Sequence, residues 1–166
     1  MEIILNVAKK ILDQNYIHFL IIGDGTAKIK LQKLAKKMNL TNVNFELLQP
    51  YEDLPKLLKS VDCHLVVQKI GISDAVLPSK LTGILASGIN SVITAKKDTS
   101  LGKFCENHPG ISVLVDPESE TELLKGITKA LKMTSPNFIA QEYAQNYLDK
   151  EVILKNFLID ITKEIK

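Results

Sequence analysis

The hydrophobic positions of the chain follow two alternating patterns. In residues 2–14, apolar residues recur at the spacing that places them on one face of a helix: Ile3, Ile4, Val7, Ala8, Ile11 and Leu12. Short apolar runs typical of strands covered on both faces follow at 18–22, 43–48, 63–68, 91–95 and 111–115. Helical spacing returns within 23–40 and at 51–60, 79–87, 99–107, 119–132, 135–148 and 149–165.

This regular alternation of helices and strands predicts an α/β fold. Parallel strands need a crossover connection between them, so the pattern is typical of a Rossmann-like parallel sheet with helices on both faces. The 166 residues suit a single domain, 1–166, and contain no repeat, low-complexity segment or interdomain linker.

Several helix ends have recognisable signals. Gly88 is expected to stop the helix at 79–87. Ser119, with Glu122 three residues later, has the spacing of a capping box. The Ser-Pro pair 135–136 and Asp149 are expected to open the last two helices.

Composition excludes several classes of function. The net charge of +2 gives no bulk attraction to nucleic acid, and 45% hydrophobic residues is ordinary for a protein with a buried core. The two cysteines and three histidines have no ligand spacing, so we expect reduced thiols and no metal or other cofactor. The opening residues lack the apolar run of a signal peptide or membrane span. We therefore expect a cytoplasmic protein with at most peripheral contact at the inner face of the membrane.

The basic residues limit how an anion could be bound. All 21 are lysines, so the chain has no arginine to grip a phosphate through two parallel hydrogen bonds. An anion would have to be held by lysine or by backbone amides at the start of a helix.

The first candidate site is the turn Gly23-Asp24-Gly25, which follows a predicted strand and opens a helix. Glycines in this place let a phosphate approach the backbone closely. The third glycine of a dinucleotide fingerprint is absent, because position 28 is lysine. The alternative is an ordinary tight turn that needs positive φ.

The second candidate site is Pro78-Ser79-Lys80. Ser79 is expected to cap the following helix, whose free amides would point into the crevice at the carboxyl ends of the strands. Lys80 lies in the first turn, where a cation opposes the helix dipole unless an anion lies in front of it. Asp74 in the preceding loop, and Thr82, could bond to sugar hydroxyls. The alternative is an ordinary cap with a solvated lysine and a loop acid.

Four stretches of the sequence resemble one known family in the same order. They are FLIIGDGTAKIKLQKLA at 19–35, VNFELLQPYEDLPKLLKSVDCHLVV at 43–67, LPSKLTGILASGINSVIT at 77–94 and ISVLVDPESETELLKGITKAL at 111–131. Together they resemble the C-terminal domain of group-one glycosyltransferases, which are retaining enzymes of the GT-B architecture. The resemblance is strongest to the bacterial capsular and colanic-acid type.

The resemblance implies a domain that binds a nucleotide-sugar donor, linked to UDP or GDP, with no metal needed for the transfer. It implies that Gly23, Gly25, Ser79 and Lys80 lie at the diphosphate, and that Asp74 and Thr82 lie at sugar or ribose hydroxyls. It places Leu48, Gln49 and Tyr51 near the nucleobase. It identifies no catalytic residue. The C-terminal helices, 136–166, would pack toward an acceptor-binding N-terminal domain.

The chain departs from the family in ways that leave two functions open. The family's first strand, which lies in the middle of its sheet, has no counterpart here, so we expect its neighbours to expose their edges or to pair with each other. The acceptor domain is also absent, so we expect that it is supplied by another domain or a partner chain. The first hypothesis is the donor-binding part of a glycosyltransferase in cell-surface polysaccharide assembly. The alternative is a non-catalytic nucleotide-binding module or a subunit of a split transferase.

Overall fold

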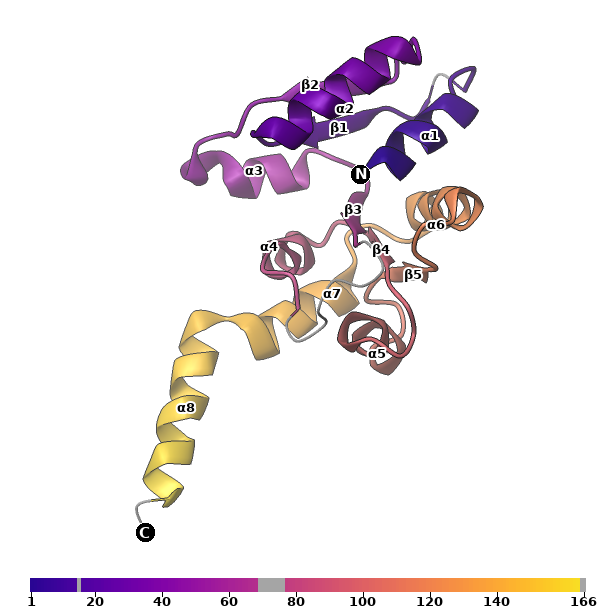
Figure 1. Ribbon diagram of the computed structural model, residues 1–166. Coiled ribbons are helices and arrows are strands. Elements are labelled where there is room, and N and C mark those ends of the chain that lie inside the picture. Colours follow the sequence, from indigo (N-terminus) through magenta and orange to yellow (C-terminus); the bar gives the residue numbers. More distant parts are fainter. Residues whose placement is uncertain (15, 69–76, 165–166) are drawn as a thin grey trace.

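Helices and strands alternate along the chain, in the order that the sequence predicts (Figure 1). The computed structural model describes residues 1–14, 16–68 and 77–164. The first half contains α1 (Glu2–Lys10), β1 (Phe19–Ile22), α2 (Thr26–Lys37), β2 (Val43–Glu46), a 3-10 turn η1 (Tyr51–Asp53), α3 (Leu54–Lys59) and β3 (His64–Val67). The second half contains α4 (Lys80–Ser87), β4 (Ser91–Thr94), α5 (Ser100–Asn107), β5 (Val113–Val115), α6 (Glu120–Lys132), α7 (Phe138–Tyr143), a π-helical turn η2 (Ala144–Leu148) and α8 (Lys150–Glu164).

The five predicted strands all form, and they make two parallel sheets. β1 pairs with β2, and β3, β4 and β5 pair in that order, while β1 and β3 share no ladder. Of the two outcomes expected for the neighbours of the family's first strand, the structure shows the unpaired edges and not a direct pairing of β1 with β3. The two sheets share a core, because α1 packs against α6.

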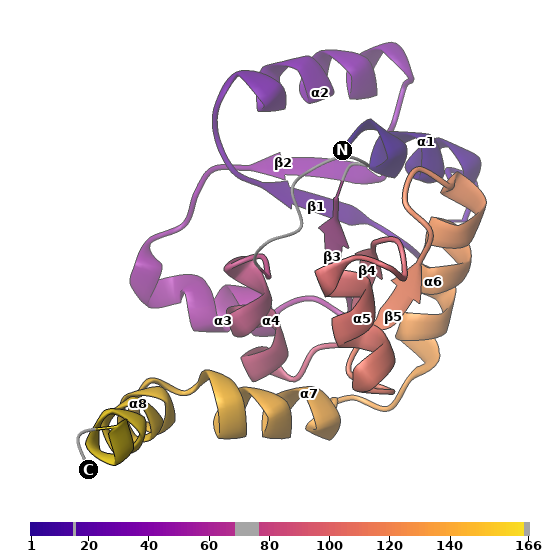
Figure 2. The same cartoon turned by 60° about the horizontal axis from the view of Figure 1, so that its bottom comes forward.

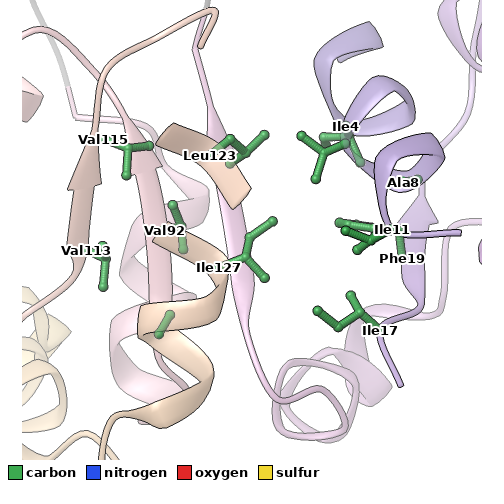
Figure 3. Packing of buried hydrophobic residues seen from close by; sticks show 12 residues of the cluster. Ile4, Ala8, Ile11, Ile17, Phe19, Val92, Val113, Val115, Leu123 and Ile127 are labelled. Atoms are coloured by element: carbon green, nitrogen blue, oxygen red, sulfur yellow. The ribbon is translucent and has the colours of Figure 1, made fainter. Parts of the chain in front are cut away.

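One hydrophobic cluster fills the space shared by α1, β1 and the second sheet. Figure 3 shows Ile4, Ile11 and Phe19 opposite Leu123 and Ile127 of α6. A second cluster lies on the other face of β4, among α4, α5 and α7. All four β4 side chains are buried because helices cover this strand on both faces.

The ends of the helices differ in part from the sequence-based expectation. Ser119 Oγ accepts the Glu122 N–H at 3.3 Å, which confirms Ser119 as the cap of α6. Asp149 caps α8 as expected, through the N–H groups of Glu151 and Val152. The first helix is shorter than predicted and ends at Lys10, because Ile11 leaves helical geometry while its side chain stays in the core.

The segment before α7 shows the clearest difference. The helix does not begin at Pro136, as predicted, because Asn137 is the residue whose side chain accepts the Ala140 N–H. Asn137 is extended and buried, and its Nδ2 donates to Asn90 and to the backbone of Gly110. This network fixes the position at which α7 begins.

The last helix extends away from the rest of the molecule (Figure 1). α7 packs against α4, whereas α8 contacts mainly the adjoining turn η2. As a result, Ile153, Leu154, Phe157 and Leu158 are exposed. The expectation that 136–166 packs toward another domain stays a prediction.

Candidate functional site

The turn after β1 has the backbone shape expected of a glycine turn. Gly25 has φ 104° and ψ 177°, a conformation that side-chain-bearing residues rarely adopt, and it forms the N-cap of α2. However, the Gly25 N–H donates to Asp24 Oδ1 at 2.7 Å, and the Gly23 N–H donates to Glu46 O at 3.4 Å. Both glycine amides are thus engaged within the protein. Their expected contact with a diphosphate stays a prediction.

The first turn of α2 offers groups that sequence reasoning missed. The N–H groups of Thr26 and Ala27 have no acceptor within the helix, because the first amides of a helix precede its hydrogen-bonding pattern. Lys28 Nζ donates to Glu46 O at 2.6 Å, so its ammonium lies where β2 ends. The only feature of the sequence that pointed to this group was Lys28, which stands where a dinucleotide fingerprint would have its third glycine.

The residues expected near a nucleobase follow β2 directly. Leu48 is 69% exposed and Tyr51 is 86% exposed, and both are large apolar side chains. Gln49 is also exposed, and its Nε2 donates to Leu47 O at 3.0 Å. The segment after β2 therefore exposes apolar side chains, and the expected nearness of a nucleobase stays a prediction.

The start of α4 differs from the expected cap. Ser79 already has helical backbone angles, φ −55° and ψ −34°, and its side chain makes no cap hydrogen bond. The prediction that Ser79 caps the helix is therefore wrong, because an N-cap side chain needs an extended backbone to reach the following amides. The Leu81 N–H donates to Pro78 O at 2.8 Å instead. The amides of Ser79 and Lys80 precede the first hydrogen bond within the helix.

Lys80 and Thr82 lie on the exposed side of α4. Although part of the Lys80 side chain reaches solvent, surrounding protein desolvates its ammonium and lowers its pKa. No carboxylate is paired with Lys80 among the residues that the structure describes. Asp74 and the loop glycine Gly71 lie outside the described residues.

The end of β3 is fixed to β4 by a hydroxyl that the sequence did not single out. Thr94 Oγ1 accepts the Gln68 N–H at 2.9 Å and lies 3.3 Å from Gln68 O, to which it donates. Thr94 is fully buried. These two bonds tie Gln68, just after β3, to β4.

The start of α2 and the start of α4 lie on the same side of the molecule (Figure 2). α2 begins directly after the turn that follows β1, and neither helix has an acidic residue in its first turn. By contrast, α1 has Glu2 there, and α6 has Glu120 and Glu122. Lys28 and Lys80 oppose the dipoles of their helices, so an anion between the helix starts would be favourable to both.

Other chemistry has less support in the described part of the chain. No group of three or more histidine, cysteine or acidic side chains could hold a metal there. Burial raises the pKa of Cys63 to about 12 and that of Cys105 to about 11, so neither is suited to act as a nucleophile. None of the described helices is long and apolar enough to span a bilayer.

A groove of about 620 Å³ runs along the outer side of α6, lined by residues that include Leu124, Lys125 and Lys129. Its lining residues all belong to α6, except Met133, which follows the helix, and none belongs to a strand. We therefore do not regard it as the donor site, because nucleotides bind open parallel sheets at the carboxyl ends of the strands.

Comparison with known proteins decides the family. The family model described as "Glycosyl transferases group 1" matches residues 1–147. The chain belongs to the group 1 glycosyltransferases. This confirms the resemblance that the four sequence stretches indicated.

A curated relative in the group 1 glycosyltransferases shares half of its aligned residues with this chain. It is the "Putative colanic acid biosynthesis glycosyl transferase WcaI" of Escherichia coli (strain K12), 50% identical over 161 residues. The alignment covers 97% of this chain but 39% of that protein, so the chain spans well under half of its relative's length.

A solved structure supports the fold. The catalytic domain of cholesterol-alpha-glucosyltransferase from Helicobacter pylori superposes with a TM-score of 0.64 at 19% identity. The match covers 89% of this chain and 87% of that one. It confirms the α/β, GT-B-like fold class of this group 1 glycosyltransferase chain.

Proposed function

We propose that the chain is the nucleotide-sugar donor-binding part of a glycosyltransferase that acts in cell-surface polysaccharide assembly. Membership of the group 1 family supports the reaction class, and the relative named for colanic acid biosynthesis supports the pathway class. The proposal includes a UDP- or GDP-linked donor, a cytoplasmic location with at most peripheral membrane contact, and transfer without a metal ion.

The observation that carries the proposal is the pair of helix starts, those of α2 and α4, on the same side of the molecule. Each has free first-turn amides and a lysine, and neither has an acidic residue in its first turn. A diphosphate placed there would accept hydrogen bonds from the amides of Thr26 and Ser79 and would neutralise Lys28 and Lys80. During transfer, the same groups would stabilise the charge that develops on the leaving diphosphate.

The exposed segment after β2 supports a place for the base. Tyr51 presents its ring to solvent, close in sequence to the end of the strand whose carbonyl Glu46 O binds Lys28. An aromatic face and apolar side chains at this position suit stacking with a nucleobase. Such a contact would bind UDP and GDP with little discrimination, since every base has a flat face.

Calorimetric titration of the full chain with UDP, GDP and their sugars, in the presence of EDTA, tests the proposal. We expect binding at or below millimolar concentration, and a loss of about 10- to 100-fold in affinity for Lys80→Met, as for the loss of one charged hydrogen bond. Lys36→Met, at the exposed opposite end of α2, is the matched control and should bind normally. The proposal fails if no nucleotide binds, or if both variants lose affinity equally.

The alternative, a non-catalytic nucleotide-binding module, predicts the same titration result but no transfer of sugar. Once the acceptor-binding part and an acceptor are added, a donor-binding part should transfer the sugar from the bound nucleotide to an acceptor hydroxyl, with UDP or GDP as the leaving group. A non-catalytic module should bind the nucleotide sugar and leave its bond to the diphosphate intact. Measuring free UDP or GDP over time, with and without the added part, separates the two.

A further inference from the structure

A pocket of about 320 Å³ lies between the end of α5 and the segment formed by α7 and η2. Its lining includes His108 on the α5 side, and Glu142, Tyr143, Asn146 and Tyr147 on the other side. The spacing of the last four places them on one face of the helical segment. The volume is at the lower end of the range for ligand pockets, about 300–1,000 Å³.

A chain of four rings leads from the core to this pocket. The buried ring of Phe104 lies 5.1 Å from the His108 ring and 5.2 Å from the Tyr143 ring, measured between centroids. His108 and Tyr143 meet edge to face at 4.6 Å, and Tyr147 lies 4.9 Å beyond Tyr143. Tyr147 belongs to η2, a π-helical turn of a kind that is rare and often found at functional sites. The inner rings thus support Tyr147, which is 63% exposed.

The polar groups of the pocket suit hydroxyls better than an anion. His108 Nδ1 donates to Phe104 O at 2.9 Å, because a carbonyl oxygen can only accept, so Nε2 is the second polar atom of that ring. Glu142 and Asn146 are exposed, and neither side chain has a hydrogen bond or ion pair within the described part of the chain. None of the described lining residues is a lysine, in contrast to the groove along α6 and the starts of α2 and α4.

The pocket lies at the amino ends of the strands of the second sheet. His108 comes shortly before β5, and Gly88 O, which accepts the Asn137 N–H at 2.7 Å, comes shortly before β4. Because β4 and β5 are parallel, both points belong to the same end of the sheet. Figure 2 shows α7 below α4 and α5, with α2 at the far side of the molecule. The pocket is therefore separate from the candidate donor site.

A sugar ring suits this combination better than a nucleotide or a cation does. One face of a pyranose carries C–H groups that can pack on an aromatic ring, and its rim carries hydroxyls that bond to carboxylate and amide groups. A nucleotide base could also stack, but its phosphates would then lie near the Glu142 carboxylate without a lysine to offset the repulsion. A cation is held well where rings enclose it away from water, whereas Tyr147 and Glu142 are both exposed.

We propose that this pocket binds a neutral saccharide, with a sugar ring on Tyr147 and hydroxyls at Glu142 and Asn146. The choice of a glycan as the ligand rests on the proposed function in polysaccharide assembly. Tyr143 and His108 are positioning residues, because they hold the ring of Tyr147 from behind. A glycan bound here would stay close to the transferase between reactions, since a second point of attachment raises its effective concentration.

Two-dimensional amide NMR of the full chain, without nucleotide, tests the proposal. The probes are methyl β-D-galactopyranoside and methyl β-D-glucopyranoside, with choline as the cation for comparison. We expect at least one glycoside to shift amides within 108–111 and 142–147, saturating at one millimolar dissociation constant. Tyr147→Ala should weaken this binding by about three- to tenfold, and Tyr147→Phe, which keeps the ring, should bind normally. Phe138→Ala is the matched control, because Phe138 is an equally exposed ring of α7 that does not line the pocket.

The proposal is overturned if neither glycoside shifts these amides at high millimolar concentration, or if choline binds there and the glycosides do not. It is also overturned if Tyr147→Ala and Phe138→Ala weaken binding equally, since the effect would then not come from the ring in the pocket. Shifts confined to 24–28 and 79–82 would overturn it as well, because they would place the saccharide at the candidate donor site. The donor-binding proposal is read out with UDP and GDP at those two helix starts, so its failure is distinguishable from failure of this one.

Discussion

The buried amide of Asn137 is the place where a single substitution should affect stability most clearly. Its Oδ1 accepts the Ala140 N–H at 3.0 Å, and its Nδ2 donates to Gly110 O at 2.9 Å and to Asn90 Oδ1 at 3.1 Å. Asn137 is 6% exposed and Asn90 is 2% exposed, so water cannot readily replace the bond between these two side chains. Asn137→Ala removes all three at once.

The size of the loss follows from the groups left behind. Losing the N-cap of α7 costs about 1 kcal/mol. Asn90 Oδ1, on a buried residue, loses a donor at about 1–3 kcal/mol, and Gly110 O, on an exposed residue, loses one at about 0.5–1.5 kcal/mol. Because neighbouring effects are not additive, we expect a total of roughly 3–5 kcal/mol, a large share of the stability of an ordinary domain.

Urea denaturation followed by circular dichroism measures this loss. Asn137→Ser keeps an oxygen that can cap α7 but cannot reach Gly110, so it should be about 1 kcal/mol more stable than Asn137→Ala. Asn146→Ala, at an exposed position in the adjoining turn, should lie within about 0.5 kcal/mol of the unmodified chain. A loss below about 1 kcal/mol for Asn137→Ala, or one equal to that of Asn146→Ala, would refute the reasoning.

Two further substitutions test the packing and electrostatics. Gly126→Ala would place a Cβ 2.6 Å from Val115 Cγ1, between α6 and the sheet, and should destabilise by about 1–3 kcal/mol in the same urea assay; an unchanged midpoint would contradict this packing. Hydrogen bonds from Lys10 and Asn6 lower the pKa of Glu120, so this carboxylate stabilises the fold above its unfolded pKa, and the benefit is lost as pH falls through the lower folded pKa. Glu120→Gln should therefore be slightly less stable than the unmodified chain at pH 7 and equal to it in acid. A difference in urea midpoint that grows on acidification would contradict the assignment.

The sequence predicted the elements better than their assembly. The apolar runs located all five strands, because their side chains have to be buried on both faces whatever the order of the sheet. The split between β1 and β3 could not be read from periodicity, since FLII and HLVV look the same whether or not a neighbour is present.

Helix ends were predictable where a side chain makes a local bond and not where distant groups decide. Ser119 and Asp149 bond to amides two or three residues away, so their signals are local. Asn137, and not Ser135-Pro136, begins α7. Its Nδ2 group donates to Asn90 Oδ1 and Gly110 O, which are far away in sequence, while its Oδ1 caps the helix. Ser79 fails as a cap because its own backbone is already helical.

The candidate site was only partly predictable for a similar reason. The glycine turn follows β1 directly, as the βα order requires, and Lys80 opens α4. The contact of Lys28 with Glu46 O joins two elements whose pairing the sequence does not specify. The hydrogen bonds that the Gly23 and Gly25 N–H groups donate were equally unpredictable. The bond from Gly25 depends on the rotamer of Asp24, and the bond from Gly23 depends on the register of β1 and β2.

The most direct test of the donor-binding proposal is a two-dimensional amide NMR titration of the full chain with UDP and GDP. The proposal predicts that the largest shift changes fall at 24–28 and 79–82, at the starts of α2 and α4, and that they saturate together at one dissociation constant. Changes confined to the groove along α6, at 121–133, or no change up to millimolar nucleotide, would contradict it.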